Sequence, residues 1–268
     1  MNDSAQDRYP VSTEAFQRDG FAVLRGCCPQ TEIAAMRRAV DRDLEGPAGP
    51  AEYEADVAYP GAPAARSAPG GGTVRRLLDA LARAPVFARW ACDPALTAPI
   101  RQLLASRDVR VVRAHHNCIM TKHPRFSSAT GWHQDTRYWS FQRPDLVNAW
   151  TALDRESPDN GGMRLIPGSH RASFPPRSFD EDQFFIEDRP ENRRWIDSAI
   201  QVELEPGDVL LFHAGLLHSA GPNTTAQRKR SVVFSYRDAG NLPLPGTRSA
   251  SRRDLDPDGA LPDRPACR

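Results

Sequence analysis

The feature that most constrains this chain is the segment Trp132-His133-Gln134-Asp135, combined with a second histidine, His218, far downstream. On an extended strand, residues i and i+2 point to the same face, so His133 and Asp135 can both face a barrel interior while Gln134 points outward. Two imidazoles and one carboxylate form a facial triad, which holds Fe(II) on one side and leaves adjacent positions open. The chain must therefore fold so that a distant strand brings His218 beside this segment.

Length and composition are those of a folded enzyme. The 268 residues are 40% hydrophobic and 26% charged, which is sufficient for a sizeable core. All-β barrels of this length often form one domain. We therefore expect a single catalytic domain over residues 1–268.

The charge balance limits the class of partner. Lys and Arg number 35 against 34 Asp and Glu, a net charge of +1 that gives no drive toward nucleic acid or an acidic membrane. No apolar run is long enough to span a bilayer, and the polar first residues differ from a signal peptide. Five cysteines without CxxC spacing argue against a disulfide framework or a thiolate zinc site. We expect a cytoplasmic protein with a small-molecule substrate, no nucleic acid and no membrane partner; the oligomeric state stays open.

The first part of the chain, residues 12–108, predicts mainly helical support. Ser12 is a good N-cap for a helix that Gly20 ends, and a strand-length apolar run follows. Apolar residues recur every three or four positions over 31–44, as in an amphipathic helix. Residues 46–72 are rich in Pro, Gly and Ala, which predicts a mobile loop and leaves a lid as one alternative. Helical patterns resume over 74–90 and 94–105.

Short strands dominate the next part, residues 109–237. Turn signals rich in Gly, Pro, Asn and Asp separate apolar runs. The runs cover 109–122, 132–139, 146–153, 163–167, 200–204, 208–213 and 230–237. Helices first and short strands after predict a mainly β fold with supporting helices (α+β), built on a double-stranded β-helix of the jelly-roll or cupin type. The irregular insert 171–200 is expected to cover the substrate, and 238–268 to form a flexible tail.

Several motifs, in order, carry a family resemblance. They are Phe16-Gln17-Arg18-Asp19-Gly20-Phe21, Lys122-His123-Pro124, Trp132-His133-Gln134-Asp135, Ala149-Trp150-Thr151-Ala152-Leu153-Asp154, Asn160-Gly161-Gly162-Met163-Arg164-Leu165-Ile166-Pro167-Gly168-Ser169-His170, Pro206-Gly207-Asp208, and His218 with Asn223. From about Thr13 to Arg237 the chain resembles the phytanoyl-CoA dioxygenase (PhyH) branch of the Fe(II)/2-oxoglutarate-dependent oxygenases. The resemblance implies Fe(II), with 2-oxoglutarate and O2 as co-substrates and succinate and CO2 as by-products.

In this interpretation His133, Asp135 and His218 bind the metal, and the open positions accept the keto acid and O2. A halogenase on this scaffold needs a small residue in place of the carboxylate. Because Asp135 is present, we do not expect halogenation. We expect hydroxylation, desaturation or ring closure at an unactivated C–H bond of a small metabolite, in natural-product tailoring. Phytanoyl-CoA itself is not implied, because pockets vary across the family.

The distal carboxylate of 2-oxoglutarate needs a cation. The family's arginine usually lies eleven residues after the last histidine, and this position holds Lys229. Strand alternation places Lys229, Ser231 and Val233 on one side and Arg230 on the other, which favours Lys229. A shift of one residue would favour Arg228 or Arg230, which can bind a carboxylate with two hydrogen bonds. We predict Lys229 and Arg230 jointly and leave the choice open.

The resemblance suggests further site residues, each with packing as the competing interpretation. The resemblance places His116, Thr130 and Trp150 around 2-oxoglutarate, whereas Tyr138, Trp139 and Phe141 are expected at the substrate mouth because they follow the metal motif directly. Arg75 and Arg76 are candidates for an anionic substrate or for a solvated helical face. Two other functions stay open: a cupin-like protein that binds a metal or ligand without catalysis, and a zinc hydrolase. The cluster Arg228-Lys229-Arg230 favours the oxygenase over the binding protein.

Overall fold

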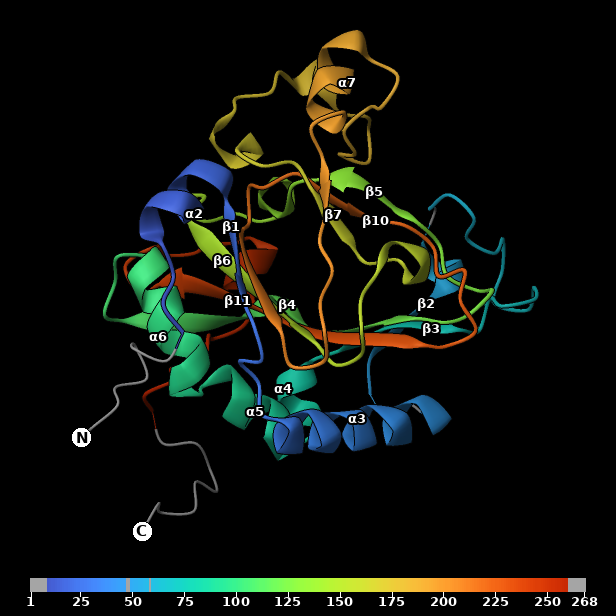
Figure 1. The fold of residues 1–268 in the computed structure, drawn as a ribbon, viewed down its shortest axis with the longest axis horizontal. Coiled ribbons are helices and arrows are strands. Elements are labelled where there is room, and N and C mark those ends of the chain that lie inside the picture. The colour runs from blue at the N-terminus through green and yellow to red at the C-terminus, as the bar shows by residue number, and fades with distance from the viewer. Residues whose placement is uncertain (1–8, 47–48, 58, 260–268) are drawn as a thin grey trace.

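The chain folds around two antiparallel β-sheets in a computed structural model that describes residues 9–46, 49–57 and 59–259 (Figure 1). The larger sheet has seven strands in the order β1-β9-β6-β11-β4-β3-β2, and the smaller has four in the order β5-β10-β7-β8. The strands of the larger sheet are β1 (Phe21–Leu24), β9 (Val209–His213), β6 (Leu146–Ala152), β11 (Lys229–Asp238), β4 (Val109–Lys122), β3 (Val74–Leu78) and β2 (Ala51–Tyr53). Those of the smaller sheet are β5 (Thr130–His133), β10 (His218–Ala220), β7 (Met163–Leu165) and β8 (Ile200–Gln201). The predicted double-sheet jelly roll is confirmed.

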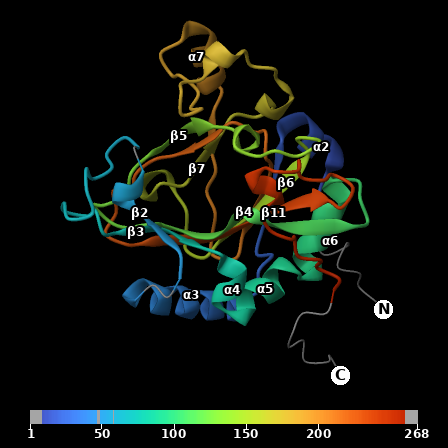
Figure 2. The same ribbon diagram turned by 180° about the vertical axis from the view of Figure 1, so that it is seen from behind.

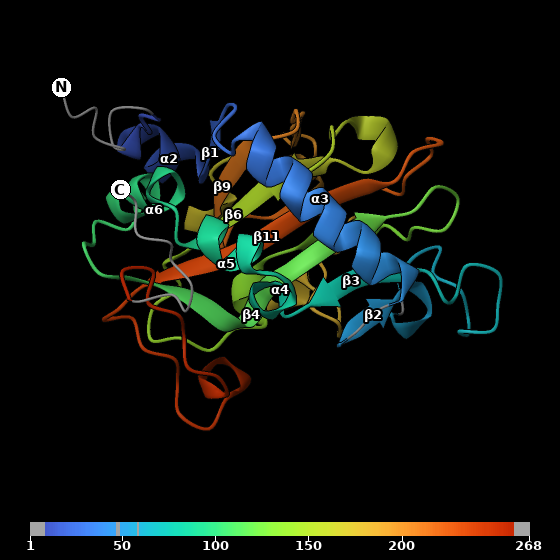
Figure 3. The ribbon, with the colours of Figure 1, turned by 90° about the horizontal axis from the view of Figure 1, so that it is seen from below.

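Helices cover the outer face of the larger sheet. Figures 1 and 3 show α3 (Gln30–Glu45) crossing its strands, with α4 (Ala80–Arg83) and α5 (Pro85–Ala91) beside it. Helices α2 (Thr13–Asp19) and α6 (Pro94–Leu103) lie at one end of the molecule, as the reverse view shows (Figure 2). The cap predictions hold: the Ser12 side chain accepts from the backbone N–H of Ala15, and Gly20 ends α2 with a positive φ of 86°.

Alternation along β11 divides the core into two layers. Val232, Phe234 and Tyr236 join the cluster between the sheet and the helices, whereas Val233 joins the cluster between the two sheets. Every residue of β6 is buried, because helices cover one of its faces and the smaller sheet the other. The inner face of β6 and β11 therefore forms a wall of the barrel interior.

Three of the predicted elements need correction. Residues 74–78 form β3 rather than the start of a helix, and 51–53 form β2, so the larger sheet gains edge strands from the part expected to be only support and loop. Residues 238–259 are not a flexible tail: Leu255 pairs with Val111 of β4, and Arg237 binds Asp254 at 2.6 Å. Residues 260–268 of that predicted tail lie outside the described residues.

The insert 171–200 folds over the smaller sheet. It contains α7 (Pro190–Ile196), which lies on the side opposite α3 in Figure 1. Its apolar side chains form a cluster with residues next to the histidines of the motif. The buried members are Trp132, Ile166, Phe179, Phe185, Ile196 and Leu217. Among the described helices, none is long and apolar enough to cross a bilayer.

Candidate metal centre

His133, Asp135 and His218 meet at one end of the barrel. His133 is the last residue of β5, His218 is the first of β10, and the two are direct partners in the β5–β10 ladder. Gln134 keeps an extended backbone, so Asp135, which opens a 3-10 helix (Asp135–Arg137), stays on the side of His133. One ligand atom from each of the three side chains lies within 4.8 Å of the others. Gln134 does not point to solvent as expected: it is buried and donates to the Gly215 carbonyl at 2.5 Å.

The backbone fixes the tautomer of both histidines. Nδ1 of His133 donates to the Gly131 carbonyl, and Nδ1 of His218 to the Leu216 carbonyl, each at 2.9 Å. This leaves each Nε2 without a proton and facing Asp135, at 3.8 Å and 3.9 Å from its oxygens. A neutral imidazole with a free Nε2 is the form that binds a metal.

The charges at the centre suit a divalent cation. Burial lowers the pKa of His133 to about 3, and burial also lowers the pKa of His218. Burial alone would raise the pKa of Asp135, but the charge of His116 and its hydrogen bond to the carboxylate act against burial, and the pKa lies below its ordinary value. Two neutral imidazoles and one ionised carboxylate are the donor set that Fe(II) takes.

Two neighbours hold the carboxylate of Asp135. Its Oδ2 accepts from Asn148 Nδ2 at 2.7 Å, and its Oδ1 accepts from His116 Nε2 at 3.1 Å. Asn148 is oriented in turn by the Ser235 hydroxyl. His116 therefore reaches the metal centre, whereas we predicted it at the co-substrate. We did not predict Asn148, although a polar residue inside the apolar run of β6 was a signal.

Of the predicted aromatic residues, Tyr138 contacts a triad histidine, Trp139 contacts His116, and Phe141 packs against His115. Tyr138 lies with its ring 6.4 Å from that of His133, is 44% exposed, and donates to the Asp182 carbonyl. Trp139 packs edge-on to His116 and stacks on His115, with ring centroids 5.1 Å and 5.0 Å away. Phe184 of the insert also contacts the His133 ring, at 6.0 Å. The contacts of Tyr138 and Phe184 with His133, and of Trp139 with His116, support the assignment of Tyr138 and Trp139 to the substrate mouth as a proposal.

Lys229 and Arg230 point in opposite directions. Lys229 is buried on the inner face, where its Nζ lies 3.0 Å from Glu156 Oε2. Arg230 faces the helices and binds Asp154 and Asp41. The joint prediction is thus corrected, because neighbouring residues of one strand face opposite sides and only Lys229 can serve the interior.

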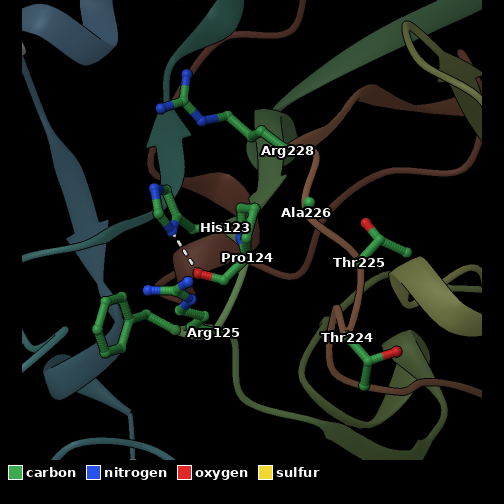
Figure 4. Close-up of a pocket in the computed structure, with 8 residues that line it drawn as sticks. His123, Pro124, Arg125, Thr224, Thr225, Ala226 and Arg228 are labelled. Atoms are coloured by element: carbon green, nitrogen blue, oxygen red, sulfur yellow. Dashed lines mark hydrogen bonds between the residues drawn. The ribbon is translucent and has the colours of Figure 1, made fainter.

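Arg228 also faces away from the barrel interior. It lines a surface cavity of about 580 Å³ with His123 and Arg125 (Figure 4). Its side chain is exposed and pairs with Asp41 at 3.9 Å, on the outer side of the sheet where Arg230 also binds Asp41. Lys229 is therefore the one candidate left from the Arg228-Lys229-Arg230 cluster.

The remaining predicted contacts already have partners within the protein. Thr130 Oγ1 accepts from Arg75, which is buried and stacks over Tyr59 instead of lying on a helical face. Arg76 pairs with Glu52 across β2 and β3. Trp150 donates from Nε1 to Glu156 at 2.6 Å. We did not predict Glu156: it follows charged residues in a turn, and no local pattern shows that it is buried.

Comparisons with known proteins identify the family to which this architecture corresponds. Residues 16–231 match the family model described as phytanoyl-CoA dioxygenase (PhyH). A probable phytanoyl-CoA dioxygenase of Caenorhabditis elegans is 23% identical over 82% of this chain and 72% of its own length. The ectoine dioxygenase of Sphingopyxis alaskensis is 25% identical over 87% of this chain and 78% of its own.

A solved structure shares the fold. The epimerase SnoN, crystallised with Fe3+, α-ketoglutarate and nogalamycin RO, superimposes with a TM-score of 0.70 at 23% identity. The superposition covers 94% of this chain and 91% of SnoN. At this identity the likeness supports the two-sheet architecture alone.

Proposed function

The chain belongs to the phytanoyl-CoA dioxygenase (PhyH) family of Fe(II)/2-oxoglutarate-dependent oxygenases, and from this premise we propose that it oxidises an unactivated C–H bond of a small, polar metabolite. Fe(II) is the proposed metal, with 2-oxoglutarate and O2 as co-substrates and succinate and CO2 as by-products. The proposed reaction at this C–H bond is hydroxylation, desaturation or ring closure. The observation that carries the proposal is the convergence of His133, Asp135 and His218 with both Nε2 atoms free.

In this proposal each group of residues has a separate task. The triad holds the iron, which when bound supplies the oxidising power of the reaction. Asn148 and His116 hold the carboxylate of Asp135 in place. Tyr138 and Trp139 position the substrate and limit the access of water. We extend the proposal to a role in natural-product tailoring. A cytoplasmic location is part of the same proposal.

The first test is an anaerobic titration of the purified protein with Fe(II) and 2-oxoglutarate. We expect the visible absorption band that an Fe(II)–keto acid complex produces, and then faster succinate release in the presence of the correct metabolite. His133→Ala and Asp135→Ala should abolish both. His123→Ala is the matched control, because His123 lies outside the triad and donates to the Pro124 carbonyl.

The same experiment separates the alternatives. Capture of iron without any succinate, across a metabolite screen, would favour a cupin-like binding protein. Activity that depends on Zn(II) rather than Fe(II) would favour a hydrolase.

A further inference from the structure

A carboxylate of the protein itself, that of Glu156, pairs with Lys229, the cation predicted to bind the co-substrate's second carboxylate. Glu156 is fully buried and accepts three side-chain hydrogen bonds. Trp150 Nε1 donates to its Oε1 at 2.6 Å, the Ser231 hydroxyl donates to the same oxygen, and Lys229 Nζ donates to Oε2 at 3.0 Å. Two of these donors, Trp150 and Lys229, are residues that the sequence assigned to 2-oxoglutarate.

The ammonium group of Lys229 has little capacity left for a ligand. Besides Glu156 it donates to the Gly161 carbonyl at 3.1 Å, and the Trp150 ring lies 5.3 Å from Nζ. Lys229 is 2% exposed, so its ammonium group takes its hydrogen-bond partners from the protein and not from bulk water. An ammonium carries three donors and one charge, and here the charge is balanced within the protein.

This cluster is on the same inner wall as the metal centre. Asn148, which holds Asp135, and Trp150, which holds Glu156, are i and i+2 on β6 and so point the same way. On the neighbouring strand β11, Ser235 and Ser231 lie four residues apart on the same face and contact Asn148 and Glu156. Two residues of strand span roughly 7 Å, a distance suited to the length of a five-carbon keto diacid.

We propose that Glu156 sets the co-substrate specificity of this chain by neutralising Lys229. The distal carboxylate of 2-oxoglutarate would lie near a Lys229 whose charge Glu156 already balances. It therefore adds little to the affinity of the site for the keto acid. The chain therefore binds 2-oxoglutarate and a 2-oxo acid without a distal carboxylate with similar affinities. This inference rests on the proposed function, and it concerns a position where the family's arginine is replaced by Lys229.

The test compares two keto acids of equal length on the Fe(II)-loaded full chain. Anaerobic calorimetric titrations with 2-oxoglutarate and with 2-oxopentanoate give two dissociation constants, independent of turnover. For the wild type we expect these constants within about tenfold of each other, the equivalent of less than one charged hydrogen bond. A preference for 2-oxoglutarate of more than about a thousandfold would overturn the inference.

The decisive variant is Glu156→Gln. It keeps an oxygen for Trp150 and Ser231 but frees the charge of Lys229. Binding of 2-oxoglutarate should tighten by about 10- to 100-fold, the contribution of a charged hydrogen bond, whereas binding of 2-oxopentanoate should stay unchanged. Equal effects on both acids, or no effect, contradict the proposal.

Two further variants serve as controls. Glu54→Gln removes another buried carboxylate, one whose hydrogen bonds run to Ser128, and should change neither affinity. The double variant Glu156→Gln/Lys229→Gln should lose the gain of the single variant; a gain that persists would show that Lys229 is not the cation involved. If folded wild type and variants bind neither acid in the presence of Fe(II), the proposed function itself fails, and this inference fails with it.

Discussion

At the residue scale, Asn148 shows how a buried amide controls a metal ligand. It is fully buried, and its Nδ2 holds one oxygen of Asp135 while the Ser235 hydroxyl holds its own carbonyl. Such partners of metal ligands restrict the orientation of the ligand, and their loss costs affinity for the metal. The position of the carboxylate is thus set by the barrel wall as well as by its own backbone.

We therefore predict that Asn148→Ala weakens binding of Fe(II), or of Co(II) as a stable substitute, by about 10- to 100-fold. Titration of the apoprotein followed by Co(II) absorption measures this change. Asn117→Ala is the matched control: Asn117 is also buried, but it contacts Leu81 and Asp79. It should lower stability and leave metal affinity unchanged. Equal metal affinity in both variants would contradict a positioning role for Asn148.

Lys122 is the second residue whose environment makes a measurable prediction. Burial, followed by the charges of Lys229 and Arg75, lowers the pKa of Lys122 to about 7. Between this value and the ordinary value of 10.5, the unfolded chain binds a proton that the folded chain does not. The free energy of unfolding therefore increases as the pH rises from about 7 to 10.5. Below about pH 7 the folded chain buries Lys122 in its charged form, and the fold is destabilised by the full cost of that burial.

Lys122→Met should remove this pH dependence. Urea unfolding at pH 7, 8 and 9 measures the free energy of unfolding of both proteins. The difference, wild type minus variant, should rise by up to about 1.4 kcal/mol per pH unit. Parallel curves would mean that Lys122 titrates at its ordinary pKa.

At the element scale, the insert 171–200 supports the strands that carry the triad. The N–H of Phe185 donates to the Trp132 carbonyl at 2.7 Å, which extends the pairing along β5. Its ring joins the cluster that contains Trp132 and Leu217, the residues immediately before the two metal-centre histidines. The predicted cover of the substrate is thus also part of the packing behind the metal centre.

Phe185→Ala should lower the free energy of unfolding by about 3–5 kcal/mol, because the ring is 2% exposed and leaves a cavity. Hydrogen exchange should quicken in the insert and in β5, while α3 keeps its protection. Leu244→Ala is the control: its side chain is 41% exposed, and its loss should cost less than about 0.5 kcal/mol. Uniform exchange over the whole chain would contradict a local supporting role for the insert.

At the scale of the whole molecule, the metal centre joins segments that are distant in the sequence. His133 and Asp135 come from the end of β5 and the turn that follows it, whereas His218 comes from β10, and both strands belong to the smaller sheet. The unfolded chain does not hold these groups together, so an ion that binds the folded state stabilises the entire barrel.

Addition of Co(II) at 100 times its dissociation constant should therefore raise the free energy of unfolding by about 2.7 kcal/mol, and removal with a chelator should reverse the gain. Denaturant unfolding with and without metal measures it. His218→Ala should lose the gain and His123→Ala should keep it. A similar gain in both variants would place the metal elsewhere.

The sequence by itself determined the features that repeat locally. The alternation of β11 correctly separated Lys229 from Arg230, because successive side chains of a strand face opposite sides. The motif around His133 and the caps of α2 could also be predicted from the sequence, because each depends on neighbours within a few residues. Residues 74–78 show the limit, since the short segment Val-Arg-Arg-Leu-Leu fits a helix as well as a strand, and pairing with β4 decided the outcome.

Only the tertiary structure decided which buried charges meet. Lys229 and Glu156 lie on segments far apart in the chain, and nothing near either residue in the sequence specifies the other as its partner. The same holds for Asn148 and Asp135. Packing of the two sheets brings these groups together in an interior that excludes water, where an unpaired charge is costly, so the partner that the fold supplies controls what each group can still bind.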